Sequence, residues 1–247
     1  MKTIKDGGAF NGMNFSRGIE IQNGITTIGK QAFREVNTTG DLVIPGSVTS
    51  VAEEAFSDST ITGNLVIQNG ITTIGIHAFR GVNATGDLVI PDSVTSVALQ
   101  AFCGLTITSN LVIPSSITTV GDEAFSSIKS TGENGTLKIG LAHIPAYLCS
   151  YSEFNNLILD DTVREVGEYA FDGSFGNLTI SEGIEEIADH GFSGAKFTGD
   201  LIIPSSVQTI GEGAFDRCGF GGRITIKEGV KNIKGAVFGR MQFYRRA

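Results

Sequence analysis

The chain has 247 residues, a net charge of −8 and a sequence pI near 4.9, so repulsion from phosphate makes nucleic acid and anionic membrane surfaces poor candidate partners. Hydrophobic residues make up 40% of the chain and charged residues 18%, which favours a folded protein over a disordered one. No stretch approaches the roughly 18 apolar residues that would span a bilayer, so we expect no membrane insertion.

Phenylalanine recurs at a fixed interval along the chain. The first six occurrences, each preceded by Ala, are 23 residues apart: Phe10, Phe33, Phe56, Phe79, Phe102 and Phe125. The pattern returns at Phe171, Phe192, Phe215 and Phe238, and Leu148, which stands 23 residues after Phe125, is expected in the same position. A fixed period of this length indicates a solenoid of about eleven stacked coils.

Each coil has the same order of predicted elements. The apolar alternation of Leu42 and Ile44 predicts a short strand that Pro45 ends by removing a backbone donor. The β-branched run 25–28 and its equivalents predict a second extended segment, and a glycine such as Gly29 then permits a turn into the Ala-Phe segment. We expect that last segment to form one turn of α-helix or 3₁₀-helix. The predicted fold class is a repeat solenoid, mainly β with short helical or 3₁₀ turns.

All coils are expected to form one domain, because a single coil cannot bury its own apolar side chains without neighbours. The expected units are a truncated N-terminal coil (1–17), five regular 23-residue repeats (18–130), an irregular coil (131–155), four further repeats (156–238) and a C-terminal tail (239–247).

The repeat resembles a known family. The segment from Ile203 to Cys218, in which Pro204 leads to Val207, Gly211 and then Ala214-Phe215, is similar to the BspA-like leucine-rich repeats, the type also named after treponemal proteins. The resemblance extends from Ala9 to Phe238, although most coils lack the family cysteine and the chain shows no export signal. It implies an extracellular or cell-surface protein that adheres to matrix proteins or other cells, with neither enzyme activity nor a cofactor.

One column of side chains is predicted to point outward from the first strand of successive coils. Its apolar members are Val43, Val66, Val89, Val112, Ile158 and Ile202, and its polar members include Lys138, Thr179 and Thr225. One interpretation is simple β-propensity on an open sheet. The other is a docking face for a partner protein, a glycan or a second copy of the chain.

Two further places could contact a partner. Ile76 and Leu99 replace charged residues shortly before the Phe position, and with Leu105 they are expected to form a small apolar patch, although drift at unconstrained exposed positions is an alternative. The irregular coil carries Tyr147, Tyr151 and Phe154, which are expected to form a local contact site because irregular segments often carry function.

The residues that carry chemistry do not converge. His77 and His190 share a position but lie five coils apart, roughly 24 Å at a ~4.8 Å coil spacing, so they cannot share a metal ion. Cys103 and Cys149 are expected in one position two coils apart, roughly 10 Å and too far for a disulfide. We expect no catalytic residue, metal site or cofactor.

The sequence therefore predicts a non-enzymatic adhesion or protein-binding module. The alternative is a structural repeat protein that self-associates into a fibre, a coat or part of a larger surface protein. The row Thr26, Thr49, Thr72, Thr95 and Thr118 offers ice binding as a weaker rival.

Overall fold

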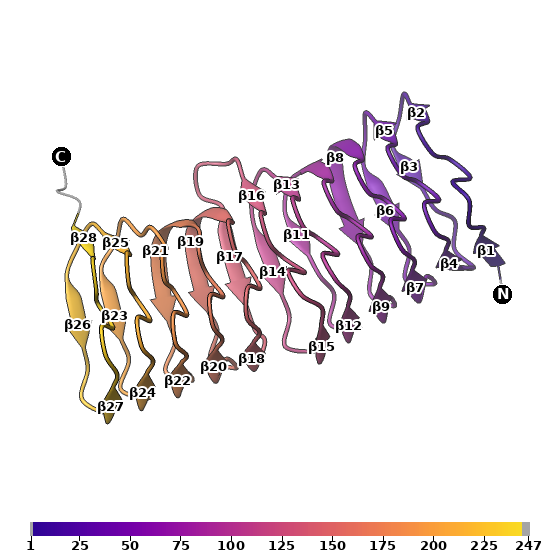
Figure 1. The fold of residues 1–247 in the computed structure, drawn as a ribbon. Helices are drawn as coiled ribbons and strands as arrows, with labels where there is room; N and C mark the ends of the chain where they lie inside the picture. Colours follow the sequence, from indigo (N-terminus) through magenta and orange to yellow (C-terminus); the bar gives the residue numbers. More distant parts are fainter. Residues whose placement is uncertain (1, 244–247) are drawn as a thin grey trace.

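The computed structural model describes residues 2–243, and it is a parallel β-solenoid of about eleven coils spaced about 23 residues apart. The coils stack along one axis, so that the N-terminal and C-terminal coils lie at opposite ends of an elongated molecule (Figure 1). The predicted solenoid is confirmed. Each regular coil contributes short strands to three rows, which we call the central, lower and upper rows.

The central row carries the predicted first strands. Its members are β3 (Ile19–Glu20), β6 (Leu42–Ile44), β8 (Thr60–Ile67), β11 (Leu88–Val89), β14 (Leu111–Ile113), β17 (Thr136–Ile139), β19 (Glu153–Leu159), β21 (Ser174–Ile180), β23 (Leu201–Ile203) and β26 (Ile224–Ile226). Ladder pairing is parallel and in register, for example Leu42 with Leu65 and Ile44 with Ile67. The alternation places these Leu and Ile side chains in the core.

The lower row carries the predicted second strands, and it is divided into two sheets. The first sheet contains β1 (Lys2–Ile4), β4 (Ile25–Ile28), β7 (Ser50–Val51), β9 (Thr73–Ile74), β12 (Ser96–Val97) and β15 (Thr119–Val120). The second sheet contains β18 (His143–Ile144), β20 (Glu165–Val166), β22 (Glu186–Ile187), β24 (Thr209–Ile210) and β27 (Asn232–Ile233). The division lies between β15 and β18.

The upper row begins each coil just after the Phe position. Its short strands are β2 (Asn14–Phe15), β5 (Asn37–Thr38), β10 (Asn83–Thr85), β13 (Thr106–Ile107), β16 (Lys129–Ser130), β25 (Gly219–Phe220) and β28 (Gln242–Phe243). The longer strands β8, β19 and β21 pair in this row through their first residues and in the central row through their last residues.

A stack of phenylalanine rings fills the corner between the lower and upper rows. From Phe10 to Phe125 the ring centroids of neighbouring coils lie 4.8 to 5.3 Å apart, with interplanar angles of 5° to 12°. The stack resumes from Phe171 to Phe215 at 5.1 to 5.2 Å. Each ring is covered by the coils on both sides, so a single coil would leave its own Phe exposed to water, which supports stacking as the source of stability.

The expected helical turn before and after each Phe is wrong, because the described residues contain no helix. Instead, residues on both sides of the Phe adopt left-handed backbone conformations, such as Glu54 with φ of 53° and Asp58 with φ of 58°. Alternate N–H groups then donate to the next coil: His77 to Leu99 at 3.1 Å and Phe79 to Ala101 at 2.8 Å. This corner is therefore a ladder of tight turns, since a helix would direct those N–H groups back into its own coil.

The irregular coil is offset by one residue from its expected register. The N–H of Phe125 donates to the carbonyl oxygen of Leu148, just as that of Phe102 donates to Ala124. Leu148 therefore occupies the Ala position of its coil and Cys149 the Phe position. Because the spacing there is 24 residues, the prediction that placed Leu148 in the Phe position is wrong. Cys149 is fully buried and interrupts the ring stack between Phe125 and Phe171.

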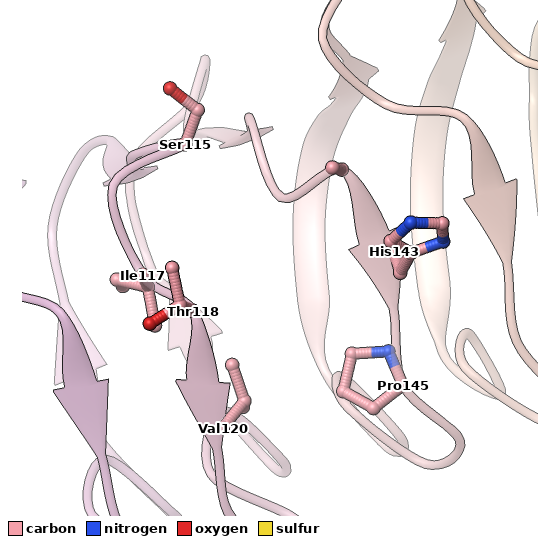
Figure 2. A pocket seen from close by; sticks show the side chains of 7 residues that line it. Ser115, Ile117, Thr118, Val120, His143 and Pro145 are labelled. Atoms are coloured by element: carbon pink, nitrogen blue, oxygen red, sulfur yellow. The ribbon is translucent and has the colours of Figure 1, made fainter.

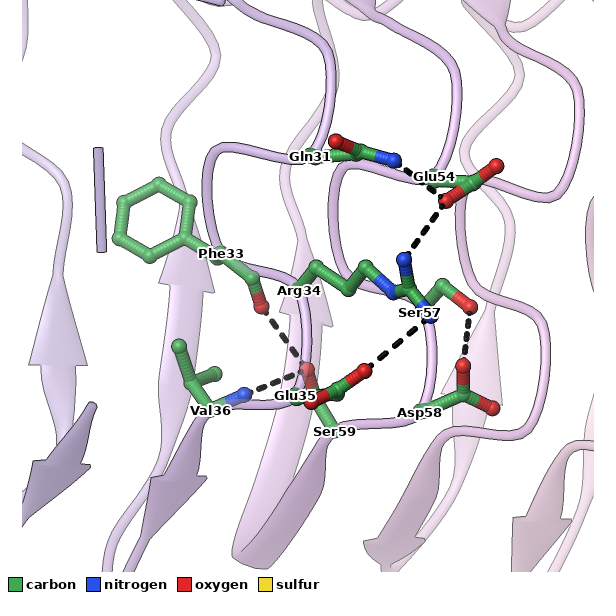
Figure 3. A network of polar contacts seen from close by, with 9 residues as sticks. All are labelled: Gln31, Phe33, Arg34, Glu35, Val36, Glu54, Ser57, Asp58 and Ser59. Atoms are coloured by element: carbon green, nitrogen blue, oxygen red, sulfur yellow. Dashed lines mark hydrogen bonds and ion pairs between the residues drawn. The ribbon is translucent and has the colours of Figure 1, made fainter. Parts of the chain in front are cut away.

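Buried serines replace an apolar side chain in two coils. Figure 3 shows Ser59, whose hydroxyl group donates to the carbonyl oxygen of Phe33 at 2.9 Å and accepts from the N–H of Val36 at 3.3 Å. Ser152 repeats both contacts, with Phe125 and Ile128. These fully buried hydroxyl groups satisfy backbone groups of the preceding coil, which is the condition for placing a polar atom in the core.

Candidate functional site

The outward column of the central row lies where the sequence predicts it. In-register pairing joins Val43 to Val66, and separately joins Val89 to Val112, Val112 to Lys138 and Lys138 to Ile158. The most exposed members are Val66 at 39%, Val89 at 54% and Ile202 at 49%, whereas Val43, Val112 and Ile158 are half-buried. The central strands follow one another along one face of the solenoid (Figure 1). The outward column on this face is apolar at Val66, Val89 and Ile202 and carries a charge at Lys138.

A shallow hollow of about 300 Å³ lies on this face. The residues that line it are Asp87, Val89, Asn110, Val112, Thr136 and Lys138. At its margin Lys138 forms an ion pair with Asp160 at 2.8 Å. The hydrogen bond from Lys138, together with one from the N–H of Asp161, lowers the pKa of the Asp160 carboxyl group below its usual value. The hollow thus combines two valines with polar and charged side chains, a mixture that also occurs at protein interfaces.

The second predicted patch is only partly exposed. Ile76 and Leu99 lie on adjacent coils and are 40% and 41% exposed. Leu105, by contrast, is fully buried, so its assignment to this patch is wrong. Leu105 stands three residues after Phe102, in the same inward position as Val36 and Val82, and that position fills the core.

The irregular coil presents two of its three aromatic residues to solvent. Tyr147 is 49% exposed and Tyr151 is 71% exposed, whereas Phe154 is only 5% exposed. Phe154 pairs in register with Phe175 and points inward from β19, so its predicted role in a surface contact is wrong. Tyr147 begins a surface stack of rings that continues through Tyr169 to His190, with centroids 5.5 and 4.9 Å apart.

A cleft that the sequence analysis did not identify lies between β15 and β18. Its volume is about 450 Å³, and we call it the inter-coil cleft. Figure 2 shows Ile117, Thr118 and Val120 on one wall and His143 and Pro145 on the other. Ser115 and Ala142 complete the lining. Val120 is half-buried, although Val97 and Ile144, its equivalents in the coils on either side, are buried.

Two local changes in sequence open this cleft. In the preceding coil, the turn from the central to the lower strand contains Pro114, Ser115 and Ser116, and the irregular coil has Gly140 alone in their place. Pro145 then occupies the position of Gly121, whose N–H donates to Val97 at 2.8 Å. Because proline has no N–H, it cannot make the equivalent bond to Val120.

The cysteines and histidines are separate from one another. Cys103, Cys149 and Cys218 are free, and Cys149 and Cys218 are buried. The prediction that Cys149 shares the position of Cys103 is wrong, because the one-residue offset puts Ser150 in that position. Nε2 of His77 lies 3.0 Å from Oε1 of Gln100, and the ring of His190 stacks on the ring of Tyr169. Within residues 2–243, no group of three His, Cys, Asp or Glu side chains is placed to hold a metal ion.

No helix of the described chain is long and apolar enough to cross a membrane.

The hydroxyl groups of the predicted threonine row are used within the solenoid. Thr49 donates to Thr26 at 3.1 Å, and Thr72 donates to Thr49 at 3.1 Å. These hydroxyl protons satisfy carbonyl groups of the preceding coil.

Comparison with known proteins identifies the repeat. The pattern of the BspA type leucine rich repeat region matches residues 2–131 and 142–244, in six copies. The residues between the two matched segments include Gly140, at the cleft. None of the curated proteins compared with the chain matches it.

Solved structures are similar to this chain to different degrees. A leucine-rich repeat protein from Bacteroides ovatus is 15% identical with a TM-score of 0.50, and the match covers 92% of this chain and 72% of that one. A leucine-rich repeat protein from Eubacterium ventriosum is 21% identical with a TM-score of 0.47, and the match covers 84% of this chain and 60% of that one. With the repeat pattern matched over most of its length, the chain belongs to the BspA type of leucine-rich repeat proteins.

Proposed function

We propose that this protein is a non-enzymatic binding module that acts at a cell surface or outside the cell, and that it holds a protein or glycan partner on the outward column of the central row. The observation that supports this most strongly is the exposure of Val66, Val89 and Ile202 on the outward side of the central row. Large apolar side chains that line up on an otherwise polar surface are typical of interaction sites.

The arrangement of the column suits docking better than catalysis. Strands hold the side chains at fixed spacing, so a partner meets a rigid surface and loses little free energy to ordering it. Burial of the exposed valine surface contributes a gross transfer term of about 25 cal/mol for each Å² removed from water, from which the cost of association is subtracted. The Lys138–Asp160 pair at the margin can add orientation, because charges at the edge of an interface contribute mainly to specificity and association rate.

The extracellular location rests on the family resemblance, which implies surface or secreted proteins. The non-enzymatic character rests on the repeat itself, because the recurring positions of each coil are filled by side chains that pack. Both are parts of the proposal.

The test uses a double variant, Val66→Lys with Val89→Lys, in solid-phase binding to a panel of extracellular-matrix proteins and to a glycan array. Both side chains are exposed, so the solenoid should fold normally, as circular dichroism and thermal unfolding will check. Thr72→Lys with Thr95→Lys is the matched control, because those exposed residues add the same charge to the lower row. We expect wild type and control to bind a shared ligand and the double variant to lose at least tenfold in affinity.

Equal binding by all three proteins would reject the column as the binding site. Self-association is the second candidate function, because the same apolar column could pair with a second copy. Light scattering over a concentration series separates the two: a wild-type monomer at every concentration favours a foreign partner. Dimers or filaments that the double variant abolishes would assign the column to self-assembly.

A further inference from the structure

The inter-coil cleft is a bounded interruption of the backbone ladder. At one end Gly140 still donates to Ile113 at 2.8 Å, and at the other Phe125 donates to Leu148 at 3.2 Å. Between these closures, within the described residues, no backbone hydrogen bond joins the two walls. The solenoid is therefore continuous on both sides of an opening that affects only the lower row.

The wall formed by β15 presents unpaired acceptors. In the coil before it, the carbonyl oxygen of Thr95 accepts N–H groups from Thr118 and Thr119 at 2.9 and 3.1 Å. The carbonyl oxygens of Thr118 and Val120 receive no such bond from the next coil. Some coils also have a serine hydroxyl that donates to the preceding coil, as Ser93 donates to Ile71 at 2.7 Å and Ser116 to Val94 at 2.9 Å, and the irregular coil lacks this serine.

The wall formed by β18 presents unpaired donors. In the following coil, the N–H groups of Arg164 and Glu165 donate to the carbonyl oxygen of Ala142 at 2.8 and 3.3 Å. The N–H groups of Ala142 and His143 occupy the equivalent positions one coil earlier. They have no backbone acceptor across the cleft. Each edge of a parallel strand carries both N–H donors and C=O acceptors, so one strand between the walls can donate to Thr118 and Val120 and accept from Ala142 and His143.

We propose that the inter-coil cleft binds a short extended segment of a partner protein, which adds a parallel strand between β15 and β18 and joins the two lower sheets. Backbone N–H groups of the segment would donate to Thr118 and Val120, and one of its carbonyl groups would accept from Ala142 and His143. Strand addition at an open sheet edge is an established mode of peptide recognition. This proposal does not depend on the central column.

The side chains around the cleft define the chemistry of the segment. Its floor is apolar, since Ile117 and Val120 line it, so the inward residue of the segment should be small or β-branched. Carboxylates lie near its rim: Asp122 and Glu123 follow β15, and Glu165 pairs with His143 at 3.1 Å on the other side, next to Arg164. A segment with an apolar residue facing inward and Lys or Arg residues at its ends matches both features.

The probe is a peptide that copies residues 93–98 of a regular coil, with one Lys added at each end and both termini blocked. Binding is measured by fluorescence anisotropy, and its site by amide hydrogen exchange at Ala142 and His143. A matched peptide is N-methylated at the two amides that correspond to Ser96 and Ala98, which removes the donors to Thr118 and Val120. We expect exchange at both amides to slow, and the methylated peptide to lose tenfold or more in affinity.

Two variants locate the peptide. Replacement of Gly140 by Pro-Ser-Ser restores the regular turn and should close the cleft without harming the fold, and Thr118→Arg should obstruct it. Thr95→Arg is the matched control, because Thr95 is the equivalent exposed residue of the preceding coil. We expect both cleft variants to lose at least tenfold in affinity and Thr95→Arg to bind like wild type.

The proposal is overturned if wild type does not bind the probe at millimolar concentration, if the methylated peptide binds equally well, or if the closed variant retains full affinity. A concentration-dependent dimer that the closed variant abolishes would also overturn it, because the occupant would then be a second copy. Loss of ligand binding in the Val66→Lys, Val89→Lys variant would leave these results unchanged, so the two proposals can fail separately.

Discussion

Pro145 lies across the inter-coil cleft from Val120 and has no N–H to give to the carbonyl oxygen of Val120 (Figure 2). The equivalent pair in the preceding coil, Gly121 and Val97, is joined by a hydrogen bond of 2.8 Å. The shortened turn at Gly140 and this lost donor at Pro145 together divide the lower row into two sheets.

The shortened turn has a measurable effect on stability. Replacement of Gly140 by Pro-Ser-Ser should raise the free energy of unfolding by about 1 kcal/mol, because the restored bonds from Ala142 and His143 to Thr118, worth roughly 0.5–1.5 kcal/mol each, outweigh the lost bond from Gly140 to Ile113. It should also cover Val120, which is half-buried in the native chain. Urea denaturation measures the change. A loss of stability would mean that the cleft walls are held apart by contacts other than the missing turn.

The ring stack should carry a large share of the stability. Phe79 is fully buried between Phe56 and Phe102, at centroid distances of 5.3 and 5.1 Å. Phe79→Ala should lower the free energy of unfolding by about 3–5 kcal/mol, because a cavity opens in the stack. Phe79→Leu is the control, since it keeps most of the volume and should cost less than half as much. Equal small losses in both variants, measured by urea denaturation, would contradict the packing account.

The buried serine Ser59 should be more sensitive than its small volume suggests. Ser59→Ala leaves the carbonyl group of Phe33 and the N–H of Val36 without the hydroxyl partner, and it should cost about 1–3 kcal/mol. Ser57→Ala is a control in the same coil, because the Ser57 hydroxyl donates to the neighbouring Asp58 side chain. Thermal and urea unfolding of both variants measure these losses. An unchanged free energy of unfolding in Ser59→Ala would contradict the role given to its hydroxyl group.

The three thiols should differ in reactivity. Burial raises the pKa of Cys218 to about 12 and also raises the pKa of Cys149, so neither forms a reactive thiolate in the folded protein at neutral pH. Cys103 is partly exposed. Ellman's reagent should therefore detect one fast equivalent in native protein, absent in Cys103→Ser, and three after denaturation. Three fast equivalents in the native protein would show that the core at Cys149 and Cys218 opens readily.

The Lys138–Asp160 pair predicts a pH dependence. The hydrogen bond from Lys138 keeps the folded-state pKa of Asp160 below its ordinary value of 3.8. The stabilisation from this pair is therefore present above that value and is lost as the pH falls through the folded-state pKa. In Lys138→Met, NMR titration of the Asp160 carboxyl group should give a pKa closer to 3.8, and an unchanged pKa would contradict the assignment.

The regular part of the fold was predictable because it repeats. Phe33, Leu42 and Ile44 recur at fixed spacing, and strand alternation places Leu42 and Ile44 in the core. The turns were not predictable, because Glu54 and His77 adopt left-handed conformations that a sequence normally signals with glycine. The register of Cys149 was missed because the turn residues lost at Gly140 and the residues added before β17 do not cancel.

The candidate sites were predictable to different degrees. The outward position of Val66 and Val89 follows from the two-residue period of a strand, whereas Leu105 and Phe154 required knowledge of which position faces the core in each coil. The inter-coil cleft left two signals in the sequence, Gly140 in place of a three-residue turn and Pro145 in place of glycine. Their effect becomes clear only when the ladder of hydrogen bonds between coils is traced.

Amide hydrogen exchange of the unliganded protein tests the division of the lower row most directly. The account predicts that the N–H groups of Ala142 and His143 exchange at least a hundredfold faster than those of Arg164 and Glu165, which donate to Ala142 in the closed ladder of the next coil. Equal protection of the two pairs would show that β15 and β18 are joined in solution, and it would remove both the inter-coil cleft and the strand-addition site proposed for it.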